Sequence, residues 1–526
     1  MVNTISSADS GSGSNSESGS DSTSTFTSAT AFASPVSAAS ASTPTPFPFS
    51  FSLPLPLPLP HLPPSPLSPP PPARPPRSHP RPPTDFSSND YLSLSTSPLL
   101  RARVLSALTA SPSILGSGGS RLLVHNSAHA HLETRLAHAF RSPAALLFNS
   151  GFDANASFFA CVPQPGDVVL YDVAIHASVH DGMRASRLPK NDDDGDNRHH
   201  RHRHSSASAS ASASASASRS RRAFAHNDVR ALRTALESLK REGKGDRSSS
   251  RSIFVAVESV YSMDGTVSPL REMLDVMEEV FPEGNAHMIV DEAHATGIYG
   301  PGGRGLVAML GLEDRVLARL HTFGKALAAS GAVLLTNTLI RDYLLNYARP
   351  FIYTTALSNA AVIAASCSFD LLEDGTAEKL ATQVLEHSTY FQDRLRASLV
   401  MSSMRELPTP IVPLLTPHAR ALSAHLLEHG LNARPISWPT VPKGTDRVRV
   451  CIHAGNTREE LDALVSAAVG WAVGVVREEG VGVVVQEEEV GRSRVRIEEK
   501  EEEEKDVMMC SGSEGGEGRR LLQSKL

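Results

Sequence analysis

Two side chains with complementary chemistry, Asp291 and Lys325, stand in short and well-defined sequence contexts. Asp291 directly follows the apolar run His287 to Val290, where a buried carboxylate is costly unless it meets a cation such as a protonated pyridine nitrogen. Lys325 lies in the run Thr322 to Ala328, among small residues that let the backbone approach a ligand closely. Burial there would lower the pKa of the lysine amine, as a Schiff-base nucleophile requires. Taken alone, Asp291 fits a helix N-cap equally well, but the pair predicts covalent catalysis on an electron-accepting ring.

The elements that must position this pair show a regular alternation. Short apolar runs rich in Val and Ile alternate with helical patterns through residues 85–190 and 223–477. Such alternation predicts an α/β fold with a buried, mostly parallel sheet, which binds ligands at the carboxyl ends of its strands. The predicted strands are Ala145 to Phe148, Val168 to Tyr171, Ile253 to Val257, His287 to Val290 and Ala332 to Leu335.

The pattern changes beyond about Leu357, where long helical stretches are followed by two short strands near Ile411 to Leu415 and Arg447 to Cys451. We therefore predict two folded units. An N-terminal segment and a large domain occupy residues 85–356, and a smaller α+β domain occupies residues 357–477.

Three segments are too polar or too rich in proline to bury a core. Residues 1–84 form a predicted disordered Ser/Pro-rich extension, residues 190–222 a disordered insertion, and residues 478–526 an acidic disordered tail. The insertion carries a His/Arg cluster at 199–204, but its ligands have no fixed spacing on a rigid element, so we expect a solvated loop and no metal site.

Composition limits the classes of partner. The chain has 526 residues and a net charge of −6, which gives no sign of general nucleic-acid binding. It contains no uninterrupted apolar run of about 18 residues, so we expect no membrane span. Its four cysteines form no CxxC motif, which argues against a disulfide framework or a zinc site.

Several motifs together resemble one enzyme family. The run Thr322 to Gly331 matches the lysine signature of class II aminotransferases at each constrained position. Further matches are Asn89 to Leu92, Gly116 to Ser120, Ser259 to Gly265 and Asp291 to Gly305. The chain thus resembles the α-oxoamine synthases, pyridoxal-phosphate enzymes of the aspartate-aminotransferase fold (fold type I), over about 85–190 and 223–470.

This resemblance implies roles for the residues around the pair. Lys325 would bind pyridoxal 5'-phosphate as a Schiff base, Asp291 would pair with the ring nitrogen, and His294 would contact the ring's oxygen substituent. His176 matches the histidine that stacks on the ring and senses the substrate. Further cofactor contacts are matched by Gly151, Phe152, Ser262, Thr322 and Thr355.

Two of these matches carry an additional expectation. Gly151 and Phe152 open a helix after a strand, and such a turn independently offers N–H groups to a phosphate. Thr355 matches a threonine that reaches the phosphate from the neighbouring subunit. The resemblance therefore implies a homodimer with shared active sites.

Substrate contacts are matched less completely. Asn89, His176 and Thr440 match substrate-binding positions of the family. The family's carboxylate-binding arginine aligns here only with a shift, and Arg434 is the candidate. An acyl-binding arginine on an N-terminal helix has no clear counterpart, so recognition of the acyl chain stays open.

Within the family, three runs resemble most the members that condense L-alanine with a pimeloyl thioester in biotin synthesis. They are Phe86 to Leu92, Thr322 to Lys325 with Ser330 to Ala332, and Ala348 to Thr355. The donor would be pimeloyl-CoA or a pimeloyl carrier protein. Two alternatives remain: a sister synthase that uses glycine or serine with another acyl-CoA, and a non-catalytic scaffold subunit, although such subunits typically lack the lysine that this chain retains.

The final residues Ser524, Lys525 and Leu526 form the Ser-Lys-Leu address that the peroxisomal import receptor reads. We therefore expect a peroxisomal enzyme with that receptor as a partner. The alternative is an accidental match on a cytoplasmic enzyme.

Overall fold

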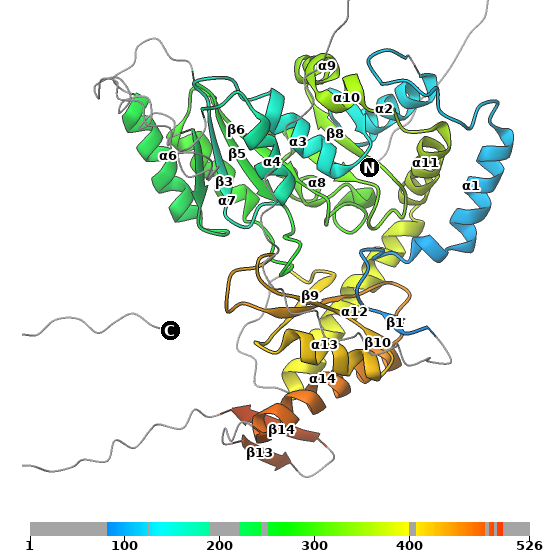
Figure 1. Ribbon diagram of the computed structural model, residues 1–526, viewed down its shortest axis with the longest axis vertical. Coiled ribbons are helices and arrows are strands. Elements are labelled where there is room, and N and C mark those ends of the chain that lie inside the picture. Colours follow the sequence, from blue (N-terminus) through cyan, green and yellow to red (C-terminus); the bar gives the residue numbers. More distant parts are fainter. Residues whose placement is uncertain are drawn as a thin grey trace, which may run out of the picture. The chain divides into compact units, whose positions relative to one another are not determined.

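The computed structural model describes residues 82–124, 126–189, 220–243, 251–398 and 407–478, and the backbone of two strands at 483–488 and 492–497 (Figure 1). The predicted disordered extension lies outside this part of the chain except for residues 82–84. Residues 190–219 of the predicted insertion and the terminal Ser524 to Leu526 also lie outside it. No helix in the described part is long and apolar enough to cross a membrane.

A seven-stranded sheet organises the large domain, with the strand order β2-β8-β7-β6-β5-β3-β4. Strand β8 runs antiparallel to both of its neighbours, and the other pairs are parallel. This arrangement confirms the predicted mostly parallel sheet and all five predicted strands. The strands are β2 (Ala144–Phe148), β3 (Val168–Asp172), β4 (Arg221–Phe224), β5 (Ile253–Glu258), β6 (Ala286–Asp291), β7 (Ala318–Thr322) and β8 (Ala332–Thr336).

Both faces of this sheet are buried, because alternate strand residues enter two separate cores. In β5, Val255 and Val257 join one core, while Phe254 and Ala256 join the other. The first core includes residues of α2, α6, α7 and α8, and the second includes residues of α3, α4, α9 and α10. These helices are α2 (Ser127–Ala139), α3 (Gly151–Cys161), α4 (Ala177–Ala185), α6 (Val229–Gly243), α7 (Leu270–Val280), α8 (Leu306–Leu310), α9 (Thr338–Tyr347) and α10 (Arg349–Tyr353).

The smaller domain is built on a three-stranded antiparallel sheet, β11-β12-β9, which packs with helices in a third core. The predicted strands Ile411–Leu415 and Arg447–Cys451 are β9 and β12, residue for residue. The remaining elements are α1 (Pro98–Ala110), α11 (Asn359–Glu373), α12 (Thr376–Ser398), α13 (Ala419–Glu428), α14 (Arg458–Glu478), β1 (Thr84–Asp85), β10 (Leu431–Asn432) and β11 (Arg434–Ile436), with short 3-10 turns at Leu94–Thr96, Pro301–Gly303 and Glu313–Arg315.

The N-terminal segment packs with the small domain, although the sequence grouped it with the large one. β1 pairs in parallel with β10, so Thr84 already belongs to a strand. Phe86 lies in the small-domain core, and its carbonyl accepts a hydrogen bond from the Cys451 N–H at 2.8 Å. The segment therefore joins β12 and β10 before the chain enters the large domain.

Two other predicted boundaries need correction. Arg221 and Arg222, assigned to the disordered insertion, lie in β4 because their backbones pair with β3 at Val169 and Leu170. Within the predicted acidic tail, β13 (Val483–Glu488) and β14 (Arg492–Ile497) pair antiparallel. Both misassignments arose because nearby charge and low complexity outweighed short strand-forming runs.

Candidate active site

The candidate residues converge because five mutually parallel strands end at one edge of the sheet. The chain leaves each of these strands through a turn that carries a predicted site residue. This is the edge at which open α/β sheets bind ligands. The residues are Gly151 after β2, His176 after β3, Ser262 after β5, His294 after β6 and Lys325 after β7.

Lys325 meets a buried histidine at this edge. Its Nζ lies 2.9 Å from Nε2 of His294, and the Nδ1 atom of that histidine lies 2.7 Å from the Tyr91 hydroxyl. Burial lowers the pKa of Lys325, and the positive charge of Arg449 lowers it further, although Asp291 and a second carboxylate oppose this. Burial also holds the pKa of His294 well below its ordinary value, with Lys325 and Arg449 adding to the effect. A neutral histidine beside an amine of lowered pKa suits proton transfer at Lys325.

Asp291 ends β6 in a buried position where each carboxylate oxygen accepts one hydrogen bond. Oδ1 accepts from the Ala293 N–H at 2.9 Å, and Oδ2 accepts from Nδ2 of Asn155 at 2.7 Å. The first bond resembles the cap that the alternative reading predicted. The second does not, because Asn155 lies on a different element, α3. Both oxygens keep a further lone pair, so the carboxylate can still receive a protonated ring nitrogen.

Asn155 extends this contact into a network that sequence reasoning missed. The side chain is only 3% exposed, and its Nδ2 also donates to Oγ of Ser178 at 3.1 Å. Ser178 Oγ in turn lies 2.8 Å from Nδ1 of His176, the predicted stacking histidine. The amide therefore ties Asp291 and His176, from neighbouring elements, into one hydrogen-bonded unit. The signal available in the sequence was a polar residue on the otherwise apolar face of α3.

Glu258 is a second buried carboxylate that the sequence did not single out. It pairs with Asp291 in register across β5 and β6, and its Oε1 atom has no hydrogen-bond partner. Burial raises the pKa of Glu258 well above its ordinary value, and the charge of Asp291 raises it further. Glu258 is therefore the member of this pair that holds a proton.

The turn between β2 and α3 forms a cradle beside β7. A Cβ atom added at Gly151 would lie 3.5 Å from Cβ of Thr322, so the helix N-terminus and the end of β7 are in close contact. Ser150 caps α3 by accepting from the Asp153 N–H, and the N–H groups of Gly151 and Phe152 precede the first intrahelical bond. Phe152 is exposed, and its ring lies edge-on to His176 at 6.4 Å. This cradle suits an anion such as a phosphate.

Arg449 of β12 brings a buried cation to the same edge. Its Nε donates to the Ser262 carbonyl at 2.5 Å, and its Nη2 donates to Asn89 Oδ1 at 3.0 Å and to the Tyr91 hydroxyl at 3.3 Å. These bonds join the small domain to the Ser262 turn and to the N-terminal segment. The arginine also lies near enough to affect Lys325 electrostatically. It is the cation in this neighbourhood best placed for a substrate carboxylate.

Three predicted residues are not in contact with this group. Arg434 lies on β11, directly opposite Arg449 in the register, but its side chain is exposed. Thr440 is exposed in the loop between β11 and β12. Thr355 is also exposed, and its carbonyl accepts a hydrogen bond from Asn149 at 2.9 Å. Their proposed roles stay predictions, and the geometry favours Arg449 over Arg434.

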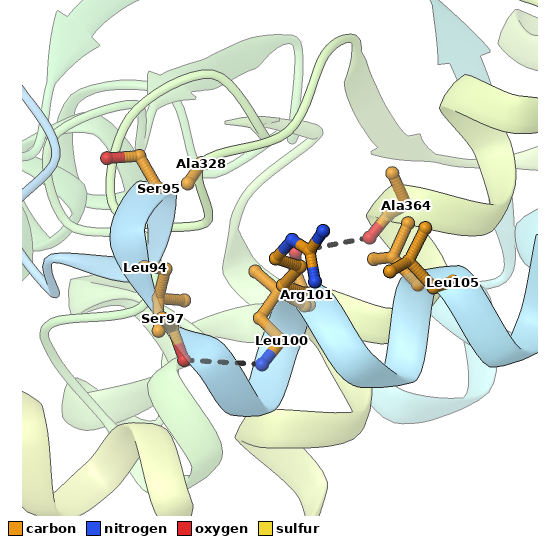
Figure 2. A pocket seen from close by; sticks show the side chains of 10 residues that line it. Leu94, Ser95, Ser97, Leu100, Arg101, Leu105, Ala328 and Ala364 are labelled. Atoms are coloured by element: carbon orange, nitrogen blue, oxygen red, sulfur yellow. Dashed lines mark hydrogen bonds between the residues drawn. The ribbon is translucent and has the colours of Figure 1, made fainter.

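A pocket of about 250 Å³ lies behind the loop that follows Lys325. Figure 2 shows Arg101 and Leu105 from α1, Ala364 from α11 and Ala328 from that loop along its walls. No predicted site residue lines it, so it is separate from the candidate active site. The loop is instead anchored from this side, since Oγ of Ser368 donates to the Leu327 carbonyl at 2.8 Å.

The residues of the candidate site match each functional group of pyridoxal phosphate. The cofactor carries an aldehyde, a basic ring nitrogen, a phenolic oxygen and a phosphate. Lys325, Asp291 and His294 supply an amine, a carboxylate and an imidazole, and the α3 N-terminus at Gly151 supplies a cradle for the phosphate. The α3 N-terminus also lies against the end of β7, since a Cβ atom added at Gly151 would be in van der Waals contact with Thr322.

Comparisons with known proteins agree with this assignment. The family model "Aminotransferase class I and II" matches residues 81–191 and 204–467. An 8-amino-7-oxononanoate synthase from Emericella nidulans is 42% identical over 74% of this chain and 89% of its own length. The aminoacyl transferase sphA from Aspergillus fumigatus is 38% identical over 74% of this chain and 80% of its own.

Solved structures show the same fold. A serine palmitoyltransferase from S. paucimobilis, with PLP and myriocin bound, matches with a TM-score of 0.60 and 25% identity over 74% of this chain and 88% of its own. An 8-amino-7-oxononanoate synthase from Francisella tularensis matches in fold with a TM-score of 0.56 and 22% identity, over 75% of this chain and 98% of its own. Given its lysine, carboxylate and histidine at the carboxyl edge of the sheet, this chain belongs to the class I and II aminotransferase family and is a pyridoxal-phosphate-dependent α-oxoamine synthase.

Proposed function

We propose that this enzyme joins L-alanine to a pimeloyl thioester with loss of carbon dioxide, giving 8-amino-7-oxononanoate for biotin synthesis. The observation that carries the substrate choice is the 42% identity to the Emericella nidulans enzyme of that name, supported by a Lysinibacillus sphaericus relative of the same name at 31%. In this reaction a bond forms between the alanine Cα and the thioester carbonyl carbon, the C–S bond breaks to release the thiol, and the bond from Cα to the alanine carboxylate then breaks.

Each residue of the site has a separate role in this reaction. When bound, pyridoxal phosphate supplies an electron sink for the bonds at the substrate Cα. Arg449 binds the alanine carboxylate, and the Lys325 amine takes the proton from Cα and later returns one. Asp291 would hold a proton on the ring nitrogen, and Nε2 of His294 would donate to the ring oxygen. His176, held through its hydrogen bond with Ser178, would lie against the ring.

Lowered solvent access explains why these groups can act at neutral pH. Lys325 would be protonated and inert as a base in water, but burial and Arg449 lower its pKa. The neighbouring His294 stays neutral, so Nε2 can exchange a proton with the amine across 2.9 Å.

A substrate panel tests the proposal. The purified enzyme is supplied with alanine, glycine or serine and with pimeloyl-CoA, a short acyl-CoA or a long acyl-CoA, and release of free thiol is measured. We expect alanine with pimeloyl-CoA to give the highest kcat/KM. Preference for glycine or serine would overturn the assignment, and a pimeloyl carrier protein assayed beside the CoA thioester identifies the donor.

A second candidate has its own support. The serine palmitoyltransferase match favours an enzyme that joins serine to a long-chain acyl group. The sphA relative at 38% identity is named an aminoacyl transferase, which leaves the acyl group open. The same panel separates the two, because that enzyme would prefer serine or another polar amino acid with a long acyl-CoA.

We further propose that the enzyme is a homodimer in which Thr355 serves the neighbouring active site. Thr355 is exposed beside Ser120, with which it forms an isolated β-bridge. Exposed Leu115, Leu123 and Tyr353 lie in the same two chain segments, as expected for a surface that a second copy covers. Light scattering on the purified enzyme tests the dimer, and a monomer at working concentration would contradict it.

The peroxisomal location is also a proposal, which rests on Ser524, Lys525 and Leu526 alone. It is compatible with a pimeloyl donor made by shortening of fatty acids in that organelle. Removal of Leu526 should leave activity in the test tube unchanged and send a tagged enzyme to the cytosol. Import that survives this deletion would refute the location.

A further inference from the structure

Tyr91 is a buried phenol at the centre of the site for which neither the motif nor the proposed reaction supplies a role. Its side chain is 0% exposed. Its hydroxyl lies 2.7 Å from Nδ1 of His294, 3.2 Å from Oδ1 of Asn89 and 3.3 Å from Nη2 of Arg449. The phenol thus touches the N-terminal segment, the large domain and the small domain through one oxygen atom.

We propose that Tyr91 is a positioning residue that fixes the proton of His294 on Nε2, within a buried chain Arg449–Tyr91–His294–Lys325 that links the amino-acid carboxylate site to the lysine. The roles of Arg449 and His294 in this statement rest on the proposed function. The placement of the proton rests on the hydrogen-bond geometry of the free site.

The proton count of the hydroxyl leads to this assignment. A phenol has one proton to donate, and the Arg449 guanidinium can only donate, so Nη2 uses a lone pair of the Tyr91 oxygen. The single proton then goes either to Asn89 Oδ1 or to His294 Nδ1. The contact to the histidine is the shorter one, and Asn89 Oδ1 already accepts from Arg449 at 3.0 Å. The Tyr91 proton therefore belongs to His294 Nδ1.

The consequence for His294 follows from its neutrality. A neutral imidazole carries one proton, and if Nδ1 accepts from Tyr91 that proton must reside on Nε2. Nε2 faces Lys325 Nζ at 2.9 Å. The ring therefore presents an N–H donor toward the atom that binds the cofactor. Without the Tyr91 hydroxyl, Nδ1 would be buried without a partner, and the Nε2–H tautomer would lose its advantage.

This row of hydrogen bonds also couples substrate binding at Arg449 to Lys325. Arg449 Nη2 divides its hydrogen bonds between Asn89 and Tyr91. A carboxylate that binds this guanidinium competes for the same N–H groups. Binding of the amino acid therefore acts on the phenol that sets the His294 proton.

The test is a pH titration of the visible absorbance of the holoenzyme, with no acyl donor present. A hydrogen bond donated to the ring oxygen favours the deprotonated form of the cofactor bound at Lys325. Tyr91→Phe keeps the buried ring but removes the hydroxyl, so we expect the titration midpoint to rise by about one pH unit. Cofactor content should stay near that of the wild type, while the melting temperature should fall, because Nδ1 of His294 loses its buried partner.

A double substitution and a matched control make the test specific. In a His294→Gln background, Tyr91→Phe should cause no further shift, because its effect passes through the histidine. Tyr299→Phe is the control, since Tyr299 is another buried tyrosine whose hydroxyl donates elsewhere, to the Pro408 carbonyl at 2.7 Å. It should leave the midpoint unchanged.

A second variant tests the same hydroxyl even if Tyr91→Phe folds poorly. Incorporation of 3-fluorotyrosine at position 91 keeps the hydroxyl and makes it a stronger donor, so the midpoint should fall. An unchanged midpoint in both variants, or an equal shift of Tyr91→Phe in the His294→Gln background, would overturn the proposal. A wrong choice of amino acid or acyl donor would not affect this titration, so failure of the proposed substrates remains distinguishable.

Discussion

The arginine that binds the substrate carboxylate can be decided by two matched substitutions on neighbouring strands. Arg449→Lys keeps the positive charge but loses the planar fork that reaches Ser262, Asn89 and Tyr91. We expect the variant to bind L-alanine much more weakly. Loss of two charge-assisted hydrogen bonds at about 1.5 kcal/mol each corresponds to about 3 kcal/mol, or on the order of 100-fold in affinity.

Spectral titration with L-alanine measures this affinity without an acyl donor, and steady-state kinetics measure kcat/KM for alanine. Arg434→Lys is the matched control, because it lies opposite Arg449 in the register but is exposed. It should change either quantity by less than about twofold. If Arg434→Lys weakened alanine binding and Arg449→Lys did not, the carboxylate site would lie on β11 and the geometric argument would be wrong.

Three further substitutions test the site and the stability of the fold. Lys325→Ala should abolish turnover by more than about a thousandfold, and borohydride reduction of the wild type followed by peptide mapping should label Lys325; a label on another lysine would refute the assignment. Asp291→Asn should retain cofactor but slow turnover by about 100-fold or more, and near-normal kcat would show that Asp291 is only a cap. Burial lowers the pKa of His129 from 6.5 to about 4, and neither ring nitrogen has a hydrogen-bond partner. Below pH 6.5 the unfolded state therefore binds a proton that the folded state does not, so the free energy of unfolding decreases as the pH is lowered. In urea unfolding between about pH 7 and about pH 5, His129→Gln should lose about 1 kcal/mol less stability than the wild type. An equal loss in the two proteins would contradict this.

The sequence predicted the central part of the fold because burial on both faces leaves a clear pattern. Strands such as Ile253–Glu258 read as apolar runs that end at a polar residue, and their alternation with helices predicts a mostly parallel sheet. The exits of these strands then place His294 and Lys325 at one edge. Elements whose pairing is distant in sequence could not be found in this way. The contact of Thr84–Asp85 with Leu431–Asn432 spans most of the chain and involves only two residues on each side.

The same distinction separates the site residues that were predicted from those that were missed. Lys325 and Asp291 have unusual local contexts, which a linear reading can detect. Asn155 and Arg449 gain their importance from partners far along the chain, Asp291 at 2.7 Å and Asn89 at 3.0 Å. A polar residue on an apolar helix face and an arginine in a buried strand were weak signals, and only the packing of separate elements gives them a role.

The division of charge between Glu258 and Asp291 leads to a final prediction. The register places both carboxylates on neighbouring strand ends, but Asp291 accepts two hydrogen bonds while Oε1 of Glu258 has no partner. Burial and the Asp291 charge therefore keep the proton on Glu258, whose pKa is raised well above 4.5. Since the folded state retains this proton where the unfolded state has lost it, Glu258 reduces stability as the pH rises above 4.5.

Replacement of a neutral acid by a neutral amide should then cost little. Glu258→Gln should keep kcat within about threefold of the wild type, in contrast to Asp291→Asn. In urea unfolding, the variant should gain stability relative to the wild type as the pH is raised from about 4.5 to about 7.5. The reason is that only the wild type must take up a proton on Glu258 when it folds. A loss of turnover as large as that of Asp291→Asn, or a stability difference independent of pH, would mean that Glu258 is ionised and shares the charge that we assign to Asp291.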